Sequence, residues 1–355
     1  MAELSQILKA ALEQKATDVF ITGGSPPMAM VSGRLCAIQG FEPIVPKDVV
    51  SLLMGNLFEE QRRILQEKLE LDCSFQLSQL ARFRMNVTMH KNGPHAVIRV
   101  IPAAIPHPDD LDLPAEVTAL TDLPRGLVLM TGPAGSGKTA TLACLLEEIN
   151  KKREAHIVTI EDPIEFAFAS KHALLCQREI GTHTLSYAAA LKSVLRQRAD
   201  VVLIGELRDM ETAEAALRIA ESGALVFSTL PTTESMQTVE RIVNMFPVER
   251  HRQINLRLAA NLKAAIAQIL MPRADGKGLV AAREIMFVNP AIENAIREGK
   301  APQIYPAVEA GAAMGMVNMD KSILRLVRNK VVTPQVALEK CHHPDALQNA
   351  MAALR

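Results

Sequence analysis

The sequence predicts an α/β fold with more than one domain, and three patterns indicate it. Residues 126–131 form a short apolar run typical of a buried strand, a glycine-rich loop follows at 132–139, and helical apolar spacing comes next. Further apolar runs at 156–161, 200–204 and 224–229 predict strands separated by helical stretches. The first hundred residues also alternate between helices and strands. At 355 residues the chain is long enough for two or three domains with cores of their own.

In the N-terminal segment, an apolar face from residue 4 to residue 12 predicts a first helix, and a long helical pattern covers 46–68. Short strands are expected at 19–22, at 28–31 and 35–38 around a hairpin turn at Ser32-Gly33-Arg34, and at 96–101.

The clearest strand pattern covers residues 81–89, where apolar and polar side chains alternate. A period of two places Arg82 and Arg84 side by side on the face directed to solvent. The returning strand at 96–101 carries a third arginine, Arg99. Without further information, a solvated strand face is the favoured interpretation of these arginines.

A proline-rich stretch follows, with four prolines between Pro102 and Pro114. Proline disfavours helix interiors, so we expect a stiff extended connector and a domain boundary here. After the central region, a strand is expected at 279–288, followed by short helices of which the last begins at Thr333-Pro334. The predicted domains are 1–101, a connector at 102–117, a P-loop domain at 118–270 and a C-terminal region at 271–355.

Composition narrows the classes of partner. The formal net charge is zero, so no overall basic field indicates nucleic acid as a partner. No apolar run approaches the length of a membrane span, and the first residues lack the apolar core of a signal peptide. We therefore expect a cytoplasmic protein.

The loop at 132–139 matches the phosphate-binding pattern G-x-x-x-x-G-K-[ST]. Its glycines let backbone N–H groups turn towards phosphates, Lys138 reaches the β and γ oxygens, and the Thr139 hydroxyl suits Mg²⁺. The loop therefore predicts a site for ATP and Mg²⁺. The residues expected to contact the nucleotide are Gly132, Pro133, Ala134, Gly135, Ser136, Gly137, Lys138, Thr139 and Ala140.

Two acidic clusters follow strands of the P-loop domain. Glu206 comes just after the apolar run at 200–204 and is expected to hold the metal together with Thr139. Glu161, Asp162 and Glu165 follow the run at 156–161 and are candidates for orienting an attacking water. The alternative is that these acids cap helices or are simply solvated.

Four segments, GPAGSGKTATLA, TIEDPIEF, REIGTHTLSY and DVVLIGELRDMETAEAALRIAESGALVFSTL, resemble the secretion-ATPase superfamily. More narrowly they resemble the type IV pilus retraction ATPases of the PilT/PilU group, and the likeness covers nearly the whole chain. It implies a PAS-like N-terminal domain, a RecA-like ATPase domain and C-terminal helices, assembled into a homo-hexamer. By position, Glu165 is the family's catalytic glutamate and Glu206 the glutamate of its Walker B motif.

The resemblance also implies that Arg82, Arg84 and Arg99 are catalytic arginines that approach the nucleotide at a subunit boundary. It implies work on the cytoplasmic face of an inner-membrane pilus platform, with a paralogous retraction ATPase as a further partner. The chain departs from the family where a histidine box is usual, since Ala224 and Pro231 replace both histidines. Hydrolysis is still expected, and these substitutions fit a slow motor or a divergent accessory paralogue.

Two other functions remain as alternatives. One is a nucleotide-sensing ring with weak hydrolysis that modulates another pilus motor. The other is a DNA-translocating ATPase, which the neutral net charge and the scarcity of aromatic residues on basic strands disfavour.

Overall fold

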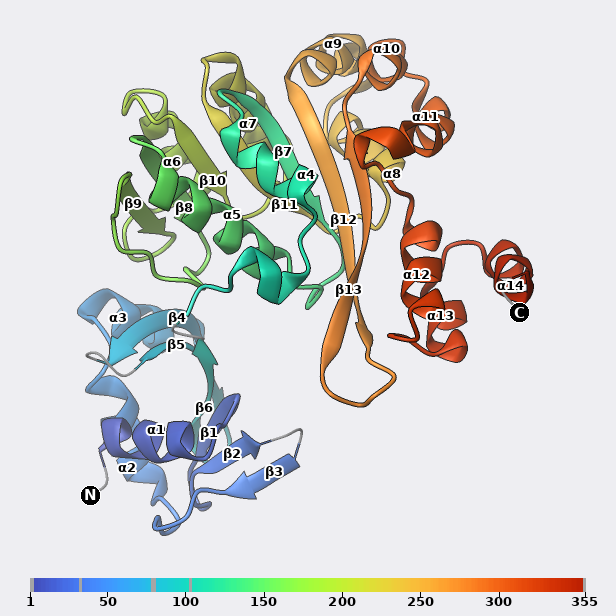
Figure 1. The fold of residues 1–355 in the computed structure, drawn as a ribbon. Helices are drawn as coiled ribbons and strands as arrows, with labels where there is room; N and C mark the ends of the chain where they lie inside the picture. The colour runs from blue at the N-terminus through green and yellow to red at the C-terminus, as the bar shows by residue number, and fades with distance from the viewer. Residues whose placement is uncertain (1–2, 32–33, 78–80, 102–103, 354–355) are drawn as a thin grey trace. The chain divides into compact units, whose positions relative to one another are not determined.

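The structure, a computed structural model of the chain, describes residues 3–31, 34–77, 81–101 and 104–353 (Figure 1). The contacts within the chain divide it into two compact units. The first comprises Met1–Ala104 together with a short later segment, Pro163–Ala167; the second comprises Ile105–Asp162 and Phe168–Arg355.

The first unit is built on a six-stranded antiparallel sheet with the order β3-β2-β1-β6-β5-β4. Alternate side chains of its central strands, among them Phe83, Met85 and Ile98, are fully buried and share one core with α1. The turn predicted at 32–34 falls partly on residues 32–33, outside the described residues. The elements are α1 (Leu4–Glu13), β1 (Asp18–Thr22), β2 (Met28–Val31), β3 (Arg34–Ala37), α2 (Pro46–Met54), α3 (Glu59–Lys68), β4 (Glu70–Leu77), β5 (Ala81–His90) and β6 (Gly93–Ile101).

The single long helical pattern predicted at 46–68 is wrong, because the structure has two helices, α2 and α3, with a break between them. Gly55 ends α2, and the Asn56 side chain donates to the Leu52 carbonyl over 3.0 Å. Phe58 then has extended backbone angles and begins α3. Glycine and asparagine compete poorly for helix interiors, so the chain breaks although the apolar period continues.

The second unit is built on a seven-stranded sheet with the order β13-β12-β7-β11-β10-β8-β9. All neighbouring strands are parallel except β13, which is antiparallel to β12. The four strands predicted in the P-loop domain are confirmed as β7, β8, β10 and β11. The strands are β7 (Gly126–Thr131), β8 (His156–Glu161), β9 (Leu174–Glu179), β10 (Val201–Ile204), β11 (Leu225–Leu230), β12 (Leu262–Pro272) and β13 (Leu279–Phe287).

Helices cover both faces of this sheet. Leu127 and Leu129 of β7 pack in a core that includes α6 to α9, whereas Val128 and Met130 pack in a core that includes α5. A strand buried on both faces has no polar alternation, which explains its continuous apolar sequence. The helices are α5 (Lys138–Lys152), α6 (Tyr187–Val194), α7 (Met210–Glu221), α8 (Ser235–Asn244) and α9 (His251–Asn261).

Strands β4, β9 and β12 were not predicted from the sequence. β12 is buried on both faces and follows directly on α9, so neither alternation nor a turn marks its start. β13 confirms the strand predicted at 279–288 and extends the sheet beyond residue 270, where a domain boundary was predicted. The division into domains at 1–101, 102–117, 118–270 and 271–355 stays a prediction.

The proline-rich connector at 102–117 was predicted to be extended, and this is wrong at 108–111, which form the short helix η1 (Pro108–Leu111), and at its end, where α4 (Ala115–Thr118) begins. The short helix η2 (Ala119–Asp122) follows it. Pro108 begins η1, where its fixed φ suits a first turn and its missing N–H costs nothing. His107 and Asp110 cap this turn reciprocally, with N–H contacts of 3.3 and 2.9 Å.

The C-terminal region is helical: α10 (Pro290–Arg297), η4 (Ala301–Gln303), α11 (Ile304–Ala310), η5 (Gly311–Met314), α12 (Met319–Arg328), α13 (Pro334–Lys340) and α14 (Pro344–Ala352). The helix start predicted at Thr333-Pro334 is confirmed, since the Thr333 hydroxyl caps α13. It is not the last helix, because α14 follows. Among the described residues, no helix combines the length and apolarity needed to span a membrane.

Candidate nucleotide-binding site

The predicted P-loop joins the carboxyl end of β7 to the amino end of α5. Gly132 and Gly137 have φ angles of 139° and 82°, which other residues rarely adopt. Gly137 is the N-cap of α5, no side chain caps this helix, and its first turn holds no acidic residue. The first N–H groups of a helix lack intrahelical partners, so this end of α5 suits an anion.

Strands β11 and β12 hold the loop from two sides. The Gly132 N–H donates to the Leu230 carbonyl over 3.1 Å. On β12, the Gln268 side-chain amide donates to the Ser136 carbonyl over 2.6 Å. A Cβ on Gly132 would lie 2.1 Å from the Gln268 carbonyl oxygen, so this position accepts only glycine. The loop is thus held in place by the sheet itself.

Lys138 lies over the loop that precedes it. Its ammonium donates to the carbonyl oxygens of Gly132 and Pro133 over 2.8 and 2.9 Å. Thr139, the next residue, is half-buried in the first turn of α5. On the other side the loop is open, because the residues from 133 to 135 are exposed. The Lys138 ammonium and the Thr139 hydroxyl therefore belong to the same helix end that suits an anion.

The two acidic clusters meet through an arginine. Arg208 donates from Nε to Glu206 over 2.9 Å and from Nη1 to Asp162 over 3.1 Å. Glu206 follows β10 and Asp162 follows β8, and these strands are parallel neighbours. The carboxyl ends of parallel strands share one edge of a sheet, so both carboxylates lie at the same edge as the P-loop. Arg208 was not predicted, although an arginine beside an acidic cluster was a visible signal.

Tyr187 adds a ring to this cluster. The Arg208 guanidinium lies 5.9 Å from the centre of the Tyr187 ring, a cation–π distance. A Cβ on Gly205 would lie 2.8 Å from the Tyr187 hydroxyl, so the ring reaches the end of β10. Burial and, next, the nearby Asp162 charge raise the pKa of Tyr187, which keeps its hydroxyl neutral.

The other acidic candidates have different surroundings. Glu161 is buried and accepts from the Thr159 hydroxyl over 2.6 Å and from the Gln177 amide over 3.1 Å. These two bonds hold the Glu161 carboxylate in the interior at the end of β8. Glu165 is half-buried and belongs to the first unit, with the segment Pro163–Ala167. The structure therefore groups Glu206 with Asp162, and groups Glu165 with the arginines of the first unit.

Arg82 and Arg84 lie on the predicted face of the strand, where both are half-buried and bonded to other groups of the chain. Arg84 donates to both carboxylate oxygens of Asp72, over 2.6 and 3.2 Å. Arg82 donates to the Ser74 hydroxyl over 2.7 Å and to the Ile164 carbonyl, also of the first unit, over 3.1 Å. Arg99 is more exposed and pairs with Asp18 over 2.9 Å. Their catalytic role stays a prediction.

Comparison with known proteins identifies the family. The family described as "Type II/IV secretion system protein" matches residues 2–313. The chain belongs to this family. The "Type IV pilus retractation ATPase PilT" of Pseudomonas aeruginosa is 40% identical over 343 residues, covering 97% of this chain and 99% of that protein. The "Type IV pilus ATPase PilU" of the same organism is 35% identical, covering 95% of this chain and 88% of that protein.

A solved structure agrees. The crystal structure of the pilus retraction motor PilT with bound ADP has a TM-score of 0.92 and 37% identity, and it covers 98% of this chain and 100% of that chain. The predicted α/β fold class and the predicted resemblance to type IV pilus retraction ATPases are confirmed. The prediction of an ATPase that binds a nucleotide is confirmed as well.

In this chain, the two positions at which the family's histidines are replaced lie at opposite ends of β11. Pro231 is exposed directly after the strand, next to Leu230, whose carbonyl holds Gly132 of the P-loop. Ala224 is buried just before the strand, roughly 20 Å away at the usual rise per residue. Of the two substitutions, only Pro231 borders the candidate site.

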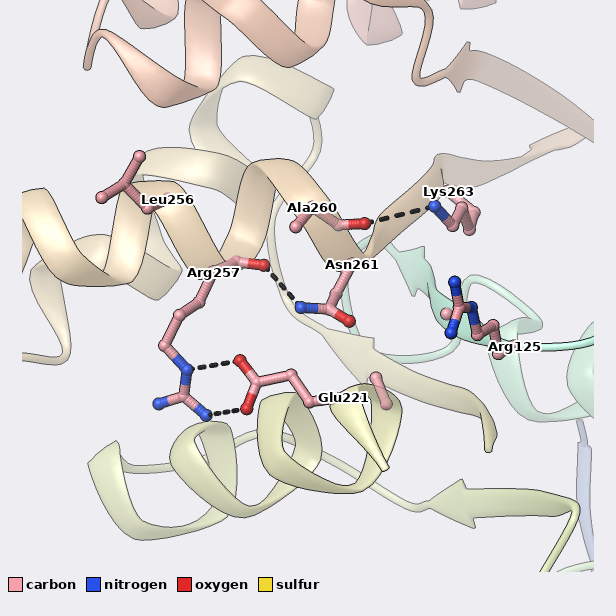
Figure 2. Close-up of a pocket in the computed structure, with 9 residues that line it drawn as sticks. Arg125, Glu221, Leu256, Arg257, Ala260, Asn261 and Lys263 are labelled. Atoms are coloured by element: carbon pink, nitrogen blue, oxygen red, sulfur yellow. Dashed lines mark hydrogen bonds and ion pairs between the residues drawn. The ribbon is translucent and has the colours of Figure 1, made fainter. Parts of the chain in front are cut away.

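A hollow of about 430 Å³ lies elsewhere in this family member, and Figure 2 shows its lining. It is lined by Arg125 and Gly126 at the start of β7 and by Lys263 of β12, hence at the sheet edge opposite the P-loop. Glu221 and Arg257 neutralise each other there through two bonds of 2.6 and 2.8 Å. None of the predicted nucleotide or catalytic residues lines this hollow.

Proposed function

We propose that this protein is an ATP-hydrolysing motor that powers type IV pilus retraction. The observation that carries the proposal is the P-loop at the uncapped end of α5, at the same sheet edge as the carboxylates of Glu206 and Asp162. The likeness to a type IV pilus retraction ATPase over 97% of the chain supports the narrower function.

In this proposal, the P-loop N–H groups and Lys138 hold the phosphates, while Thr139 and Glu206 hold Mg²⁺. Among the described residues, no group of three or more His, Cys, Asp or Glu side chains could hold a metal alone. This fits Mg²⁺, which usually takes one or two protein ligands together with phosphate oxygens and water. Bound Mg²⁺ supplies charge neutralisation as the phosphate bond breaks.

Glu165 would orient the attacking water, while Arg82, Arg84 and Arg99 would approach the nucleotide across a subunit boundary of a homo-hexamer. These groups all belong to the first unit, whereas the P-loop belongs to the second. A rigid-body movement of the first unit would therefore move these arginines relative to the nucleotide of a neighbouring subunit.

The hexamer would work in the cytoplasm, against the cytoplasmic face of an inner-membrane pilus platform. The likeness to a PilU protein supports a paralogous retraction ATPase as a further partner. The neutral net charge gives no support for nucleic acid as a partner.

The test is pilus retraction in a strain that lacks this gene, complemented with the wild-type protein or with Lys138→Ala. We expect wild type to restore retraction and Lys138→Ala to fail at equal protein abundance. Equal restoration by both proteins would exclude an ATP-driven role for this chain in retraction.

Pro231 favours a second candidate, a nucleotide-sensing ring with weak hydrolysis. Proline at this position next to the P-loop has no side-chain donor and no backbone N–H. Glu165→Gln and Glu206→Gln distinguish the two candidates. A motor loses its ATPase activity with either variant, whereas a sensor has little activity to lose and keeps its nucleotide affinity.

A further inference from the structure

A buried polar bridge connects the P-loop to the proline-rich connector. Its members are Gln268 of β12 and Arg283 of β13, which are directly opposed in the antiparallel pair. Gln268 is 2% exposed and Arg283 is 5% exposed. Both side chains point into the interior of the second unit, where polar groups persist only when they are bonded.

On one side, the bridge holds the P-loop. The Gln268 amide nitrogen donates to the Ser136 carbonyl over 2.6 Å, and its amide oxygen accepts from the Thr141 hydroxyl of α5 over 3.1 Å. A Cβ on Gly137 would lie 3.0 Å from the same amide nitrogen. Gln268 therefore contacts the segment whose N–H groups would bind the phosphates of a nucleotide.

On the other side, the bridge holds the connector. Arg283 donates from Nε to the Gln268 amide oxygen over 2.7 Å, from Nη1 to the Asp112 carbonyl over 3.0 Å, and from Nη2 to the Leu111 carbonyl over 2.7 Å. Asp112 has a left-handed φ of 47°, which turns two successive carbonyls towards one guanidinium.

Burial of the Arg283 guanidinium costs desolvation free energy. Among the described residues no carboxylate lies within ion-pair distance of Arg283, and its three hydrogen bonds go to neutral amide and carbonyl oxygens. Burial lowers the pKa of Arg283 to about 10, although the Asp112 charge opposes this. A hydrophobic pair of similar volume would fill the space at a smaller desolvation cost. The bridge thus has a role beyond packing.

We propose that Gln268 and Arg283 are positioning residues that couple the P-loop main chain to the connector. Phosphate binding fixes the Ser136 carbonyl, Gln268 passes this constraint to Arg283, and Arg283 fixes the turn at 108–112. That turn lies a few residues beyond Ala104, where the first unit ends. The inference rests on the proposed function only in requiring that the P-loop binds a nucleotide.

Hydrogen exchange of the full-length protein with and without ADP tests the coupling. In wild type, we expect ADP to slow exchange of the amides at 109–113 by about threefold to tenfold, the value of one net hydrogen bond. ADP binding itself is followed by calorimetry on the same samples. If wild type fails to bind ADP, the proposed function fails; if it binds ADP without slower exchange at 109–113, the coupling fails.

Three variants distinguish two properties: the Arg283 bonds that hold the connector, and the effect of ADP on hydrogen exchange in the connector. Gln268→Met keeps the Arg283 bonds to the connector but loses the link to Ser136, so slow exchange in the free protein should persist while the ADP effect disappears. Arg283→Met should lose both the slow exchange in the free protein and the ADP effect. Thr141→Val removes the bond between Gln268 and α5 but leaves the path from Ser136 through Gln268 to Arg283, so both the slow exchange and the ADP effect should persist. An intact ADP effect in a folded Gln268→Met protein would overturn the proposal. Where Arg283→Met does not fold, Gln268→Met and wild type still decide it.

Discussion

Arg208 donates a hydrogen bond to Glu206 over 2.9 Å and thereby orients the carboxylate that follows β10. The same guanidinium contacts Asp162 after β8 and lies over the Tyr187 ring. A carboxylate that is to share a metal with phosphates must be held in place before the ligand arrives. We therefore assign Arg208 a positioning role next to Glu206.

The pair Glu206 and Arg208 gives the first prediction. Glu206→Gln should lower kcat for ATP hydrolysis by about 100-fold or more, since the proposed metal ligand would lose its charge, whereas Arg208→Gln should lower it by less than about tenfold. Steady-state phosphate release measures both. Arg218→Gln, which changes another partly exposed arginine paired with a glutamate, is the matched control. A larger loss for Arg208→Gln than for Glu206→Gln would reverse the assigned roles.

The histidine-box positions give the second prediction. Pro231→His should raise kcat, by about threefold to tenfold, because it restores a donor beside the P-loop. Ala224→His should not raise it, since this residue is 4% exposed at the far end of β11, and should instead lower the melting temperature. Wild-type turnover equal to that of Pro231→His would show that the proline does not limit the rate.

The third prediction concerns the P-loop backbone. Gly132→Ala should destabilise the protein by about 3 kcal/mol and abolish ADP binding, because its Cβ would overlap the Gln268 carbonyl. Gly276→Ala is the matched control: its φ is also positive, at 70°, but no atom lies within 4 Å of its Cβ. That variant should cost only about 1 kcal/mol. Urea denaturation compares them, and equal costs would refute the steric explanation.

The fourth prediction concerns pH. Glu284 of β13 is buried and accepts from the N–H groups of Ser235 and Met319 over 2.6 and 3.3 Å. Burial is the largest influence and raises its pKa above the usual 4.5. A raised pKa in the folded state means a contribution that is complete below the usual pKa and is lost as pH rises through the folded value.

The free energy of unfolding of wild type relative to Glu284→Gln should therefore fall as the pH rises above the usual carboxyl pKa of 4.5. Urea denaturation at a series of pH values measures the difference. Glu298→Gln, at an exposed position of the same region, should show no such trend. A difference between wild type and Glu284→Gln that is constant with pH would contradict the assigned direction.

Sequence was sufficient for features set by neighbouring residues. The P-loop, the strand before it and the helix after it follow from local chemistry, and each appears in the structure at its predicted position. The alternation of β5 placed Arg82 and Arg84 on one face correctly. Their partners, Ser74 and Asp72, come from β4, a strand that was not predicted, so the half-burial of the arginines could not be foreseen.

The parts that sequence could not provide depend on long-range pairing. Gln268 was not singled out from the sequence, although it is a polar residue inside an apolar run, and its pairing with Arg283 depends on the register of β12 and β13. The membership of Glu165 in the first unit likewise depends on tertiary contacts of the segment Pro163–Ala167.

The most direct test of the central claim is steady-state ATP hydrolysis by the purified full-length protein. We predict Mg²⁺-dependent release of phosphate that Lys138→Ala lowers by about 100-fold or more, since in the proposed function the Lys138 ammonium would exchange its bonds to the Gly132 and Pro133 carbonyls for bonds to phosphate. Phosphate release at the same rate by a folded Lys138→Ala protein would contradict the account.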